Sequence, residues 1–547
     1  MQGLNEFQTK NKTVYILACI TLLLIAFFQC YYVSHDLNWS YDVDIHRDMS
    51  YVQGNLYGHF GQDPNFTGAY LWYNPLLTLA ETAIVKITGL PVHLVMTRAG
   101  LYLNLLSPIA FIFMMLVVSD FKVSLASLLS YLFLASGAIP CYYAATYSPW
   151  LYPVCFAQFL FYLNIILCYK AFSTQKYIWF FVLGTFIGIS FLAHTAPTIL
   201  IILIMASIQL RDVVSAVKQR DFSLIKKYVG QGLATFVPFV IASLPLTYYI
   251  VGKYHMHFLN RMPFEYVDGM FIVHNFREMI RENLSVSFVV SVIGFIWFYK
   301  KFHQVLIRKI ILNWLVISVI MYIYATAVAT ADNQFNFHLP GTVPSFHYFY
   351  YIKALQSVFF GFGFVFLISP VLKWIEQLIN RKSGSGNFAS HFFIVSVLLC
   401  AIIYLPFYQN RYDFVFFREQ NIIKEKDKDG IETYNYILQN IPEDKVILCE
   451  EKTSIFPVMP TARKMVSIGI TFSNPYLEFS SRENDRNNMV AFLRKGQPLS
   501  ASSLFDKYNV GFVLLKNLGQ ENDKTADLLH SQIVFRNSTF TIYKLGY

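Results

Sequence analysis

Charged side chains that could carry out acid–base chemistry gather soon after the first apolar segment of the chain. Asp42, Asp44 and Asp48 lie there, with Arg47 just before the last of them. A carboxylate beside the hydrocarbon edge of a membrane is costly unless it is solvated or paired. Such a group could remove a proton from an acceptor hydroxyl, whereas the alternative is that the acids only solvate a loop.

Asp42 and Asp44 also form an Asp-x-Asp pair, a pattern that can bind a divalent cation. Mg²⁺ or Mn²⁺ typically uses one or two protein carboxylates together with the phosphates of a substrate. The segment 141–152, which we expect on the same side of the membrane, contains no acid that could complete such a site. Two hypotheses therefore stay open: a Mg²⁺ or Mn²⁺ site at Asp42 and Asp44, or a single base that needs no metal.

We expect membrane-spanning helices to hold these residues at the edge of the bilayer. Of the 547 residues, 55% are hydrophobic and 14% are charged, and the mean hydropathy is +0.43; soluble proteins have about 25% charged residues. We predict a membrane all-α fold, a polytopic bundle of about eleven transmembrane helices, because the apolar runs are each about 20 residues long. The expected spans are 14–32, 99–118, 123–140, 153–170, 177–193, 197–210, 229–250, 284–299, 310–328, 350–370 and 389–408.

The stretch 177–210 is too long for one span, and we divide it between His194 and Pro197 because proline disfavours a continued helix. His194 is a polar residue in an apolar region. Its imidazole could take part in catalysis, but we interpret it as a group that satisfies backbone atoms freed at the helix break.

Lys and Arg residues are distributed unequally between the two sets of loops. With the N-terminus in the cytoplasm, the inner loops are richer in basic residues, as is typical of membrane proteins. The formal charge of +10 does not indicate nucleic-acid binding, because the basic residues lie in short loops between apolar runs. We predict an integral protein of a bacterial inner membrane, with an odd number of spans that places the C-terminal region in the periplasm or outside the cell.

That C-terminal region differs in composition from the rest, with charged clusters and no apolar run long enough to span a membrane. Short apolar runs predict strands and one polar run predicts a helix. The strands are expected at 446–449, 510–515, 532–535 and 539–544, and the helix at 486–494. We therefore predict two domains: a transmembrane module, residues 1–408, with an outer catalytic loop at 33–98, and a soluble extracytoplasmic α/β domain, residues 409–547.

Cationic and imidazole side chains in two further loops could contact a phosphate. Arg261 and Arg277 lie in the expected outer loop 251–283, and arginine suits bidentate contacts with phosphate. His347 and Lys353 lie at the end of a later loop and could also reach a phosphate. The alternatives are contacts with anionic lipid headgroups and an interfacial belt of the tyrosines that surround His347.

Residues 14–118 resemble the corresponding part of GT-C glycosyltransferases, especially the lipid A aminoarabinose transferases and their protein O-mannosyltransferase relatives. The resemblance rests on residues that stand in the family's order: Asp44, Arg47, Pro64, Gly68, Pro75, Gly89 and Arg98. It implies that Asp44 is the catalytic carboxylate, that Arg47 supports it or the donor phosphate, that Arg98 lies in the substrate site, and that the reaction inverts the anomeric carbon. Beyond residue 118 only the many-span layout and the outer C-terminal domain are similar.

Asn74 departs from this pattern, because it stands where the aminoarabinose transferases have a lysine that contacts the donor phosphate. A neutral amide cannot supply that charge. The resemblance therefore leaves the donor and its phosphate contacts open at Asn74.

These observations predict a membrane glycosyltransferase that moves a sugar from a polyprenyl-phosphate donor to a lipid, glycan or protein acceptor at the outer face. A transporter or flippase of a lipid-linked glycan is the main rival, although it would more often place ionisable residues in broken helices at the bilayer midplane. The remaining alternative is a non-catalytic assembly protein with a GT-C-like fold, which the departure at Asn74 keeps open.

Overall fold

The computed structural model describes residues 12–134, 146–260, 283–337, 339–383, 388–495, 502–517 and 531–546. Contacts divide the chain into two compact units. A helical unit comprises residues 1–36, 99–243 and 264–416, and a mixed unit of helices and strands comprises residues 37–98, 244–263 and 417–547. The segment 37–98, which contains the acidic residues, thus belongs to the same unit as the C-terminal region.

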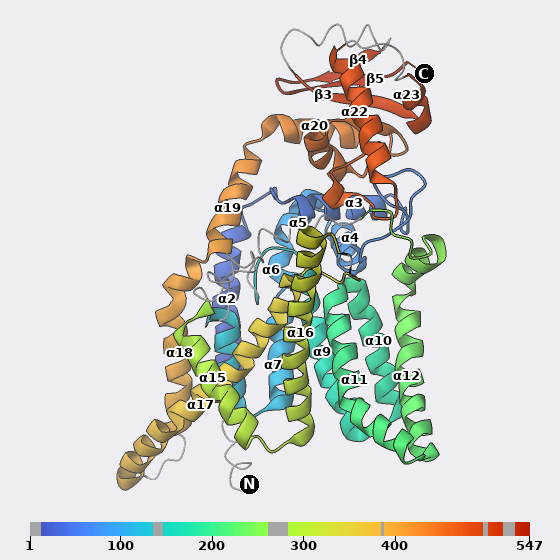
Figure 1. Ribbon diagram of the computed structural model, residues 1–547. Coiled ribbons are helices and arrows are strands. Elements are labelled where there is room, and N and C mark those ends of the chain that lie inside the picture. Colours follow the sequence, from blue (N-terminus) through green and yellow to red (C-terminus); the bar gives the residue numbers. More distant parts are fainter. Residues whose placement is uncertain are drawn as a thin grey trace. The chain divides into compact units, whose positions relative to one another are not determined.

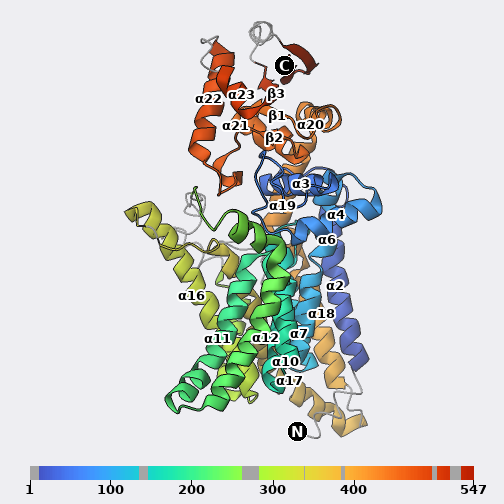
Figure 2. The ribbon, with the colours of Figure 1, turned by 90° about the vertical axis from the view of Figure 1, so that its right-hand side faces the viewer.

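The helical unit consists of long apolar helices that lie side by side (Figure 1, Figure 2). Its elements are α2 (Lys12–Ser34), α6 (Gly100–Leu103), α7 (Leu106–Val118), α8 (Phe121–Leu129), η1 (Ser130–Leu134), α9 (Pro153–Thr174), α10 (Tyr177–Ala193), α11 (Thr195–Lys218), α12 (Phe222–Thr247), α15 (Val286–Lys301), α16 (Val305–Phe335), α17 (Phe346–Ser383) and α18 (Phe388–Gln409). Over its described residues, every expected span falls on one or more of these helices, and residues 135–140, the end of the expected span 123–140, lie outside the described residues. The prediction of a membrane all-α bundle is therefore confirmed.

Eight helices of the described residues are long and apolar enough to cross a membrane. Three expected spans fall on shorter elements, namely α8 with η1, α10 and α15. The count of about eleven transmembrane helices is thus not confirmed and stays a prediction. The expected break within 177–210 is confirmed, because α10 ends at Ala193 and α11 begins at Thr195.

His194 adopts an extended backbone between these two helices, and its Nδ1 accepts a hydrogen bond from the Ala196 N–H at 3.1 Å. The imidazole thereby satisfies one of the backbone donors at the start of α11, where no preceding turn exists to accept it. This contact agrees with the structural role that we inferred for His194.

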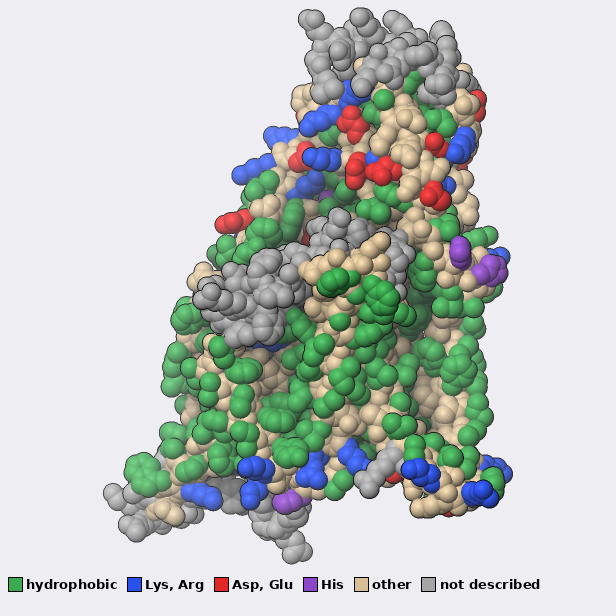
Figure 3. Space-filling view, in the orientation of Figure 1, with side chains coloured by type: hydrophobic (Ala, Val, Ile, Leu, Met, Phe, Trp, Pro, Cys, Tyr) green, Lys and Arg blue, Asp and Glu red, His purple; other side chains and the backbone are tan. Residues whose placement is uncertain are grey.

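The face of the helical unit seen in Figure 3 is apolar along its length and basic at one end. Figure 3 shows hydrophobic side chains over the bundle, with Lys and Arg gathered where α11 meets α12 and α15 meets α16. Lys300 and Lys301, for example, lie in the last turn of α15. This distribution is the one that a helical bundle in a lipid bilayer requires, with apolar side chains toward the hydrocarbon and cations beyond it.

The mixed unit carries α3 (Val43–Leu56), α4 (Leu76–Thr88), α5 (Val92–Arg98) and η2 (Tyr248–Lys253) ahead of its C-terminal part. The chain enters that part through α19 (Tyr412–Glu425). Its remaining elements are α20 (Lys428–Asn440), β1 (Val446–Cys449), α21 (Glu451–Thr453), η3 (Ser454–Val458), η4 (Met459–Thr461), β2 (Lys464–Met465), η5 (Ile470–Phe472), α22 (Phe479–Lys495), α23 (Ser502–Tyr508), β3 (Val510–Lys516), β4 (Gln532–Arg536) and β5 (Phe540–Lys544). The four predicted strands and the predicted helix are confirmed, whereas β2 is too short to show in the sequence.

The strands form one sheet in the order β2-β1-β3-β5-β4. β1 is parallel to β2 and β3, and β5 is antiparallel to β3 and β4. Successive residues of β1 point to opposite faces, so Val446 and Leu448 pack in one apolar cluster and Ile447 and Cys449 in another. Helices cover both faces, which gives the α/β arrangement that the sequence predicts.

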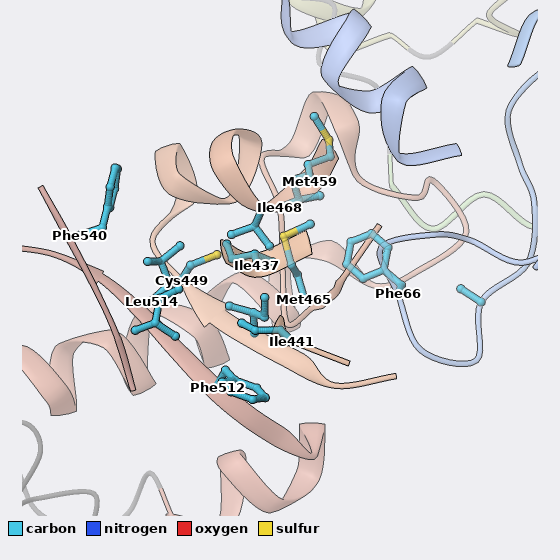
Figure 4. Packing of buried hydrophobic residues seen from close by; sticks show 14 residues of the cluster. Phe66, Ile437, Ile441, Cys449, Met459, Met465, Ile468, Phe512, Leu514 and Phe540 are labelled. Carbon is cyan, nitrogen blue, oxygen red and sulfur yellow. The ribbon is translucent and has the colours of Figure 1, made fainter. Parts of the chain in front are cut away.

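One of the two clusters includes a residue from the N-terminal part of the chain. Phe66 is 1% exposed and packs with Ile441, Met459 and Met465 beneath the sheet (Figure 4). The segment 37–98 therefore contributes a side chain to the hydrophobic core of the C-terminal region, which explains why the two segments form a single unit.

Candidate functional site

The candidate site is built on the first turns of α3. Asp42 precedes the helix with an extended backbone, and its Oδ1 accepts the Asp44 N–H at 2.8 Å. Aspartate is a favoured N-cap residue because its side chain satisfies an amide that the helix itself leaves unpaired. Asp44 follows in the first turn, where a negative charge is stabilised by the helix dipole.

Arg47 connects the acidic residues of this helix. Its Nη1 donates to Asp44 Oδ1 at 2.9 Å, and its Nε donates to Asp48 Oδ1 at 2.8 Å. Its Nη2 donates to the Tyr73 hydroxyl at 2.7 Å. The fork of the guanidinium thus holds three oxygen atoms in fixed directions, which the single ammonium of a lysine could not do.

Exposure separates the carboxylates. The side chain of Asp44 is 39% exposed and that of Asp48 is 0% exposed, while that of Arg47 between them is 11% exposed. Asp42 is also buried. Of the three predicted catalytic acids, Asp44 is therefore the one that presents a carboxylate to solvent, and Asp48 lies behind it.

Burial and charge act in opposite directions on this group of residues. Burial raises the pKa of Asp48 to about 6, although Arg47 lowers it. Burial also lowers the pKa of Arg47, but the charges of Asp48, Tyr73 and Asp44 more than compensate, so its pKa is raised well above the ordinary value. Arg47 is therefore a permanent cation at this site, and Asp48 is ionised at neutral pH.

Glu81 is a further ionisable residue coupled to this group, and it is not among the residues predicted from the sequence. It lies on α4, which ends at Gly89 in the left-handed conformation that glycine adopts freely. Glu81 is 0% exposed, and burial followed by the charge of Asp48 raises its pKa well above the ordinary value. The signal was present in the sequence, because Glu81 occupies the same helical face as Leu77 and Val85.

His46 was also missed. It is 2% exposed, its Nε2 lies 2.9 Å from the Ser40 carbonyl oxygen, and burial lowers its pKa to about 3. The imidazole is therefore neutral at physiological pH. It anchors the residues that precede α3 and does not add a charge to the site.

The loop between α3 and α4 is fixed to the C-terminal part of the mixed unit by buried polar contacts. Asp63 Oδ2 accepts from Trp72 Nε1 at 3.1 Å and from Asn474 Nδ2 at 2.9 Å. The Lys464 Nζ donates to the Asp63 carbonyl oxygen at 2.7 Å. Because Tyr73 follows directly after Trp72, these contacts position the residue whose hydroxyl meets Arg47.

The other predicted substrate-binding residues do not all meet at this site. Arg98 donates from Nε to the Leu37 carbonyl oxygen at 2.7 Å and from Nη2 to Asn38 Oδ1 at 3.0 Å. Asn74 is half-buried at the start of α4. Arg98 and Asn74 belong, like Asp44, to the mixed unit.

The two remaining described candidates belong to the helical unit. His347 Nδ1 lies 3.1 Å from the Pro344 carbonyl oxygen, and its ring centroid lies 4.7 Å from that of His194. Lys353 is 5% exposed and donates to Asn283 Oδ1 at 3.0 Å. Arg261 and Arg277 lie outside the described residues.

No group of three or more His, Cys, Asp or Glu side chains that could hold a metal ion occurs in the described part of the chain. Asp42 Oδ1 is engaged as the helix cap and Asp44 Oδ1 in the ion pair with Arg47. These two residues alone therefore do not fit a protein-built metal site, because divalent cations need further oxygen ligands.

No protein-family model matches the chain, and no curated protein matches its sequence. Solved structures do match. ArnT from Cupriavidus metallidurans in the apo state is 11% identical with a TM-score of 0.53, and the match covers 98% of each chain. ArnT bound to undecaprenyl phosphate is 12% identical with a TM-score of 0.50, covering 97% of this chain and 98% of that one. The apo oligosaccharyltransferase of Archaeoglobus fulgidus is 12% identical with a TM-score of 0.49, covering 92% of this chain and 69% of that one.

The match to ArnT extends over almost the whole of both chains, whereas the sequence resemblance was confined to residues 14–118. At this level of identity it establishes the fold. The resemblance to the aminoarabinose transferases is therefore confirmed as a shared fold.

Proposed function

We propose that this chain is a membrane glycosyltransferase that transfers a sugar from a polyprenyl-phosphate donor to a hydroxyl group of a lipid, glycan or protein acceptor. The observation that carries the proposal is the exposed carboxylate of Asp44, held by a buried arginine in a chain with the fold of ArnT. The structure of ArnT bound to undecaprenyl phosphate supports a lipid-phosphate donor for this chain as well.

In the proposed reaction, Asp44 acts as the general base. Its carboxylate removes the proton of the acceptor hydroxyl while the hydroxyl oxygen attacks the anomeric carbon of the sugar. The bond between that carbon and the phosphate oxygen breaks, and the lipid phosphate leaves with the electron pair. Attack from the face opposite the phosphate inverts the anomeric carbon, and general-base catalysis of this kind contributes about 10²- to 10⁴-fold in rate.

Arg47 and Asp48 orient the base. The contact between Arg47 Nη1 and Asp44 Oδ1 occupies one oxygen of the carboxylate, so the second oxygen is the one available for the acceptor proton. The buried Asp48 balances the charge of Arg47. Arg47 therefore holds Asp44 in place, while the negative charge of Asp44 is left unbalanced because Asp48 already offsets the charge of Arg47.

Cations must also stabilise the leaving phosphate. We assign this role to Arg98, Arg261, Arg277 and Lys353, with the neutral groups of His347 and Asn74 as further contacts of the donor phosphate. Arg98 and Lys353 are held by the hydrogen bonds described above, so contact with a phosphate would exchange those partners for a charged one, which forms the stronger hydrogen bond.

The direction of the chain in the membrane belongs to the same proposal. The basic loops of the helical unit would face the cytoplasm, which supports a cytoplasmic N-terminus. An odd number of spans would then place the C-terminal domain in the periplasm or outside the cell. Transfer would then occur at the outer face of a bacterial inner membrane.

The test is transfer of labelled sugar from a synthetic polyprenyl-phosphate donor in membranes that contain the Asp44→Asn variant. The substitution preserves size and removes the base, so we expect product formation to fall by about 10²-fold or more. Asp36→Asn removes a carboxylate that is about half exposed in the helical unit and serves as the matched control. Full activity of a folded Asp44→Asn protein would contradict the proposal.

Asp42→Asn separates the two hypotheses about metal. A single base predicts that transfer persists in this variant and is insensitive to chelators, because an asparagine side chain can still cap α3. A Mg²⁺ or Mn²⁺ site built on the pair and substrate phosphates predicts that Asp42→Asn and Asp44→Asn both abolish transfer. Movement of the intact lipid-linked sugar across the membrane without transfer would instead identify a flippase.

A further inference from the structure

Glu81 presents an unusual case among the buried side chains of the mixed unit. Its side chain has no exposed surface, and neither Oε1 nor Oε2 has a hydrogen-bond partner. Buried polar atoms are nearly always hydrogen-bonded, and an ionised carboxylate without a partner is among the most costly groups to bury. The chemical state of Glu81 therefore needs an explanation.

Charged groups of the neighbouring segments act on Glu81. The charges of Asp48 and Arg47, on α3, shift the pKa of Glu81, and the charge of Glu81 in turn shifts the pKa of Tyr73, in the loop before α4. α3 and α4 are held together by a hydrogen bond from Asn55 Nδ2 to Thr82 Oγ1 at 3.4 Å, one residue beyond Glu81. Glu81 thus lies within electrostatic reach of the residues that hold Asp44.

α5 also packs against α3 and α4 and carries two ionisable side chains, both engaged elsewhere. The His93 ring stacks on Trp39 with centroids 4.3 Å apart, and Arg98 donates to Leu37 and Asn38. Arg47 is therefore the cation that acts on Glu81.

Arg47 is already committed to other oxygen atoms. Its three donor nitrogens bond to Asp48, Asp44 and the Tyr73 hydroxyl. The second oxygen of Asp48, Oδ2, is buried without a partner, as are both oxygens of Glu81. The surroundings of Arg47 thus contain more hydrogen-bond acceptors than donors. Protonation of Glu81 would supply a further donor, because a carboxylic acid carries an O–H.

The charges around Glu81 also favour its protonated form. Arg47 and the fully buried Asp48 form a neutral pair, and the charge of Asp44 is partly solvated. An ionised Glu81 would add an unbalanced negative charge to a region without solvent, which is far more costly than retaining a proton.

We propose that Glu81 is a proton-carrying carboxylic acid, a positioning residue that reserves the Arg47 guanidinium for Asp44 and Asp48 by staying neutral. The inference deepens the proposed transferase function, on which its catalytic consequence rests. The raised pKa of Glu81, caused first by burial and then by Asp48, agrees with it. Loss of the proton at alkaline pH would create a third carboxylate competing for Arg47, and Arg47 would turn away from Asp44.

Infrared difference spectroscopy tests the protonation state without any need for turnover. A protonated carboxylic acid has a carbonyl stretch above the amide bands, and ionised carboxylates do not. We expect this band in the wild-type protein at neutral pH and its loss in Glu81→Gln. Glu432→Gln, at an exposed glutamate of the same unit, is the matched control and should leave the band unchanged.

Isotopic labelling keeps the test independent of the folding of any variant. In wild-type protein grown with glutamate labelled at the side-chain carboxyl carbon, the band should shift if it arises from a glutamic acid and stay in place if it arises from Asp48. Absence of any shifting band between pH 5 and pH 9 would overturn the inference, whether or not the protein proves to be a transferase.

The pH profile of transfer tests the positioning role. Glutamine is a neutral group of the same size, so Glu81→Gln should retain wild-type transfer at neutral pH, within about threefold, and should extend that activity to higher pH. A folded Glu81→Gln protein that loses transfer by about 10²-fold at neutral pH would show that the ionised form is required, and the inference would fail. If wild-type protein transfers no sugar, the proposed function fails while the infrared result still decides the state of Glu81.

Discussion

Arg47 Nη1 lies 2.9 Å from Asp44 Oδ1, and the two side chains differ in exposure, 11% for the arginine and 39% for the aspartate. A largely buried cation thus fixes one oxygen of a carboxylate whose side chain is partly open to solvent. Such a pair combines a defined geometry with access for a substrate, which is the requirement for a general base.

Replacement of Arg47 by lysine should separate geometry from charge. Lysine keeps the positive charge but cannot reach Asp44, Asp48 and Tyr73 in fixed directions at once. We expect transfer to fall by about 10-fold to 10²-fold, since misplacement by about 1 Å costs that much. Arg494→Lys, which changes an arginine bonded to Glu450 beside the sheet, should leave transfer unchanged. Equal activities of the two variants would contradict the positioning role of Arg47.

The helical segments were predictable because their signal is long and simple. Runs of apolar residues such as Lys12–Ser34 can form little other than a spanning helix, and the break at His194 followed from proline chemistry. The C-terminal strands were predictable for a similar reason, since β1 and β3 are short continuous apolar runs, which are typical of strands buried on both faces.

The residues around Asp44 were predictable only in part. Asp44, Arg47 and Asp48 stand close together in the sequence, and helical spacing brings them to one region of α3. Tyr73, which bonds to Arg47, and Glu81, which is electrostatically coupled to it, come from other segments, and nothing local in the sequence specifies which distant residues lie near the guanidinium. The packing of Phe66 beneath the sheet is equally non-local. The sequence therefore predicted only that Phe66 lies in the outer loop 33–98, and not that it packs in the core of the C-terminal region.

Phe66→Ala should destabilise the mixed unit. The ring is 1% exposed in the cluster beneath the sheet, and removal of such a ring typically costs about 3–5 kcal/mol. Phe60→Ala, in the same loop but with the ring 40% exposed, should cost far less. Thermal unfolding of the purified variants measures both. If Phe66→Ala lowered the unfolding temperature as little as Phe60→Ala, the stability of the mixed unit would not depend on the packing of Phe66.

Asp48 should make stability depend on pH in a defined direction. Burial raises its pKa from 3.8 to about 6, so the folded state holds the proton more tightly than the unfolded chain. The stabilising contribution is therefore complete below about pH 4 and is lost as the pH rises through 6, by about 1.4 kcal/mol per pH unit within that window.

Comparison with Asp48→Asn isolates this contribution. The unfolding temperature of the wild-type protein, relative to that of the variant, should fall between pH 4 and pH 6 and then level off. His46, whose pKa burial lowers to about 3, acts in the opposite sense in both proteins and cancels in the difference. A difference that rises with pH would mean that the ion pair with Arg47 outweighs burial at Asp48.

Asn74→Lys tests where the donor phosphate lies. Asn74 is half-buried at the start of α4, next to Tyr73, whose hydroxyl meets Arg47. A lysine ammonium within about 4 Å of a phosphate contributes a few kcal/mol near a protein surface, part of which is offset by desolvation. If the phosphate lies at this position, KM for the polyprenyl-phosphate donor should fall by about 10-fold, because the contact exists in the donor complex, and kcat should not fall, because the leaving phosphate gains negative charge in the transition state. Asn537→Lys, in the connection between β4 and β5, supplies a cation away from Asn74 and should not change KM. An unchanged or higher KM in Asn74→Lys would place the phosphate away from α4.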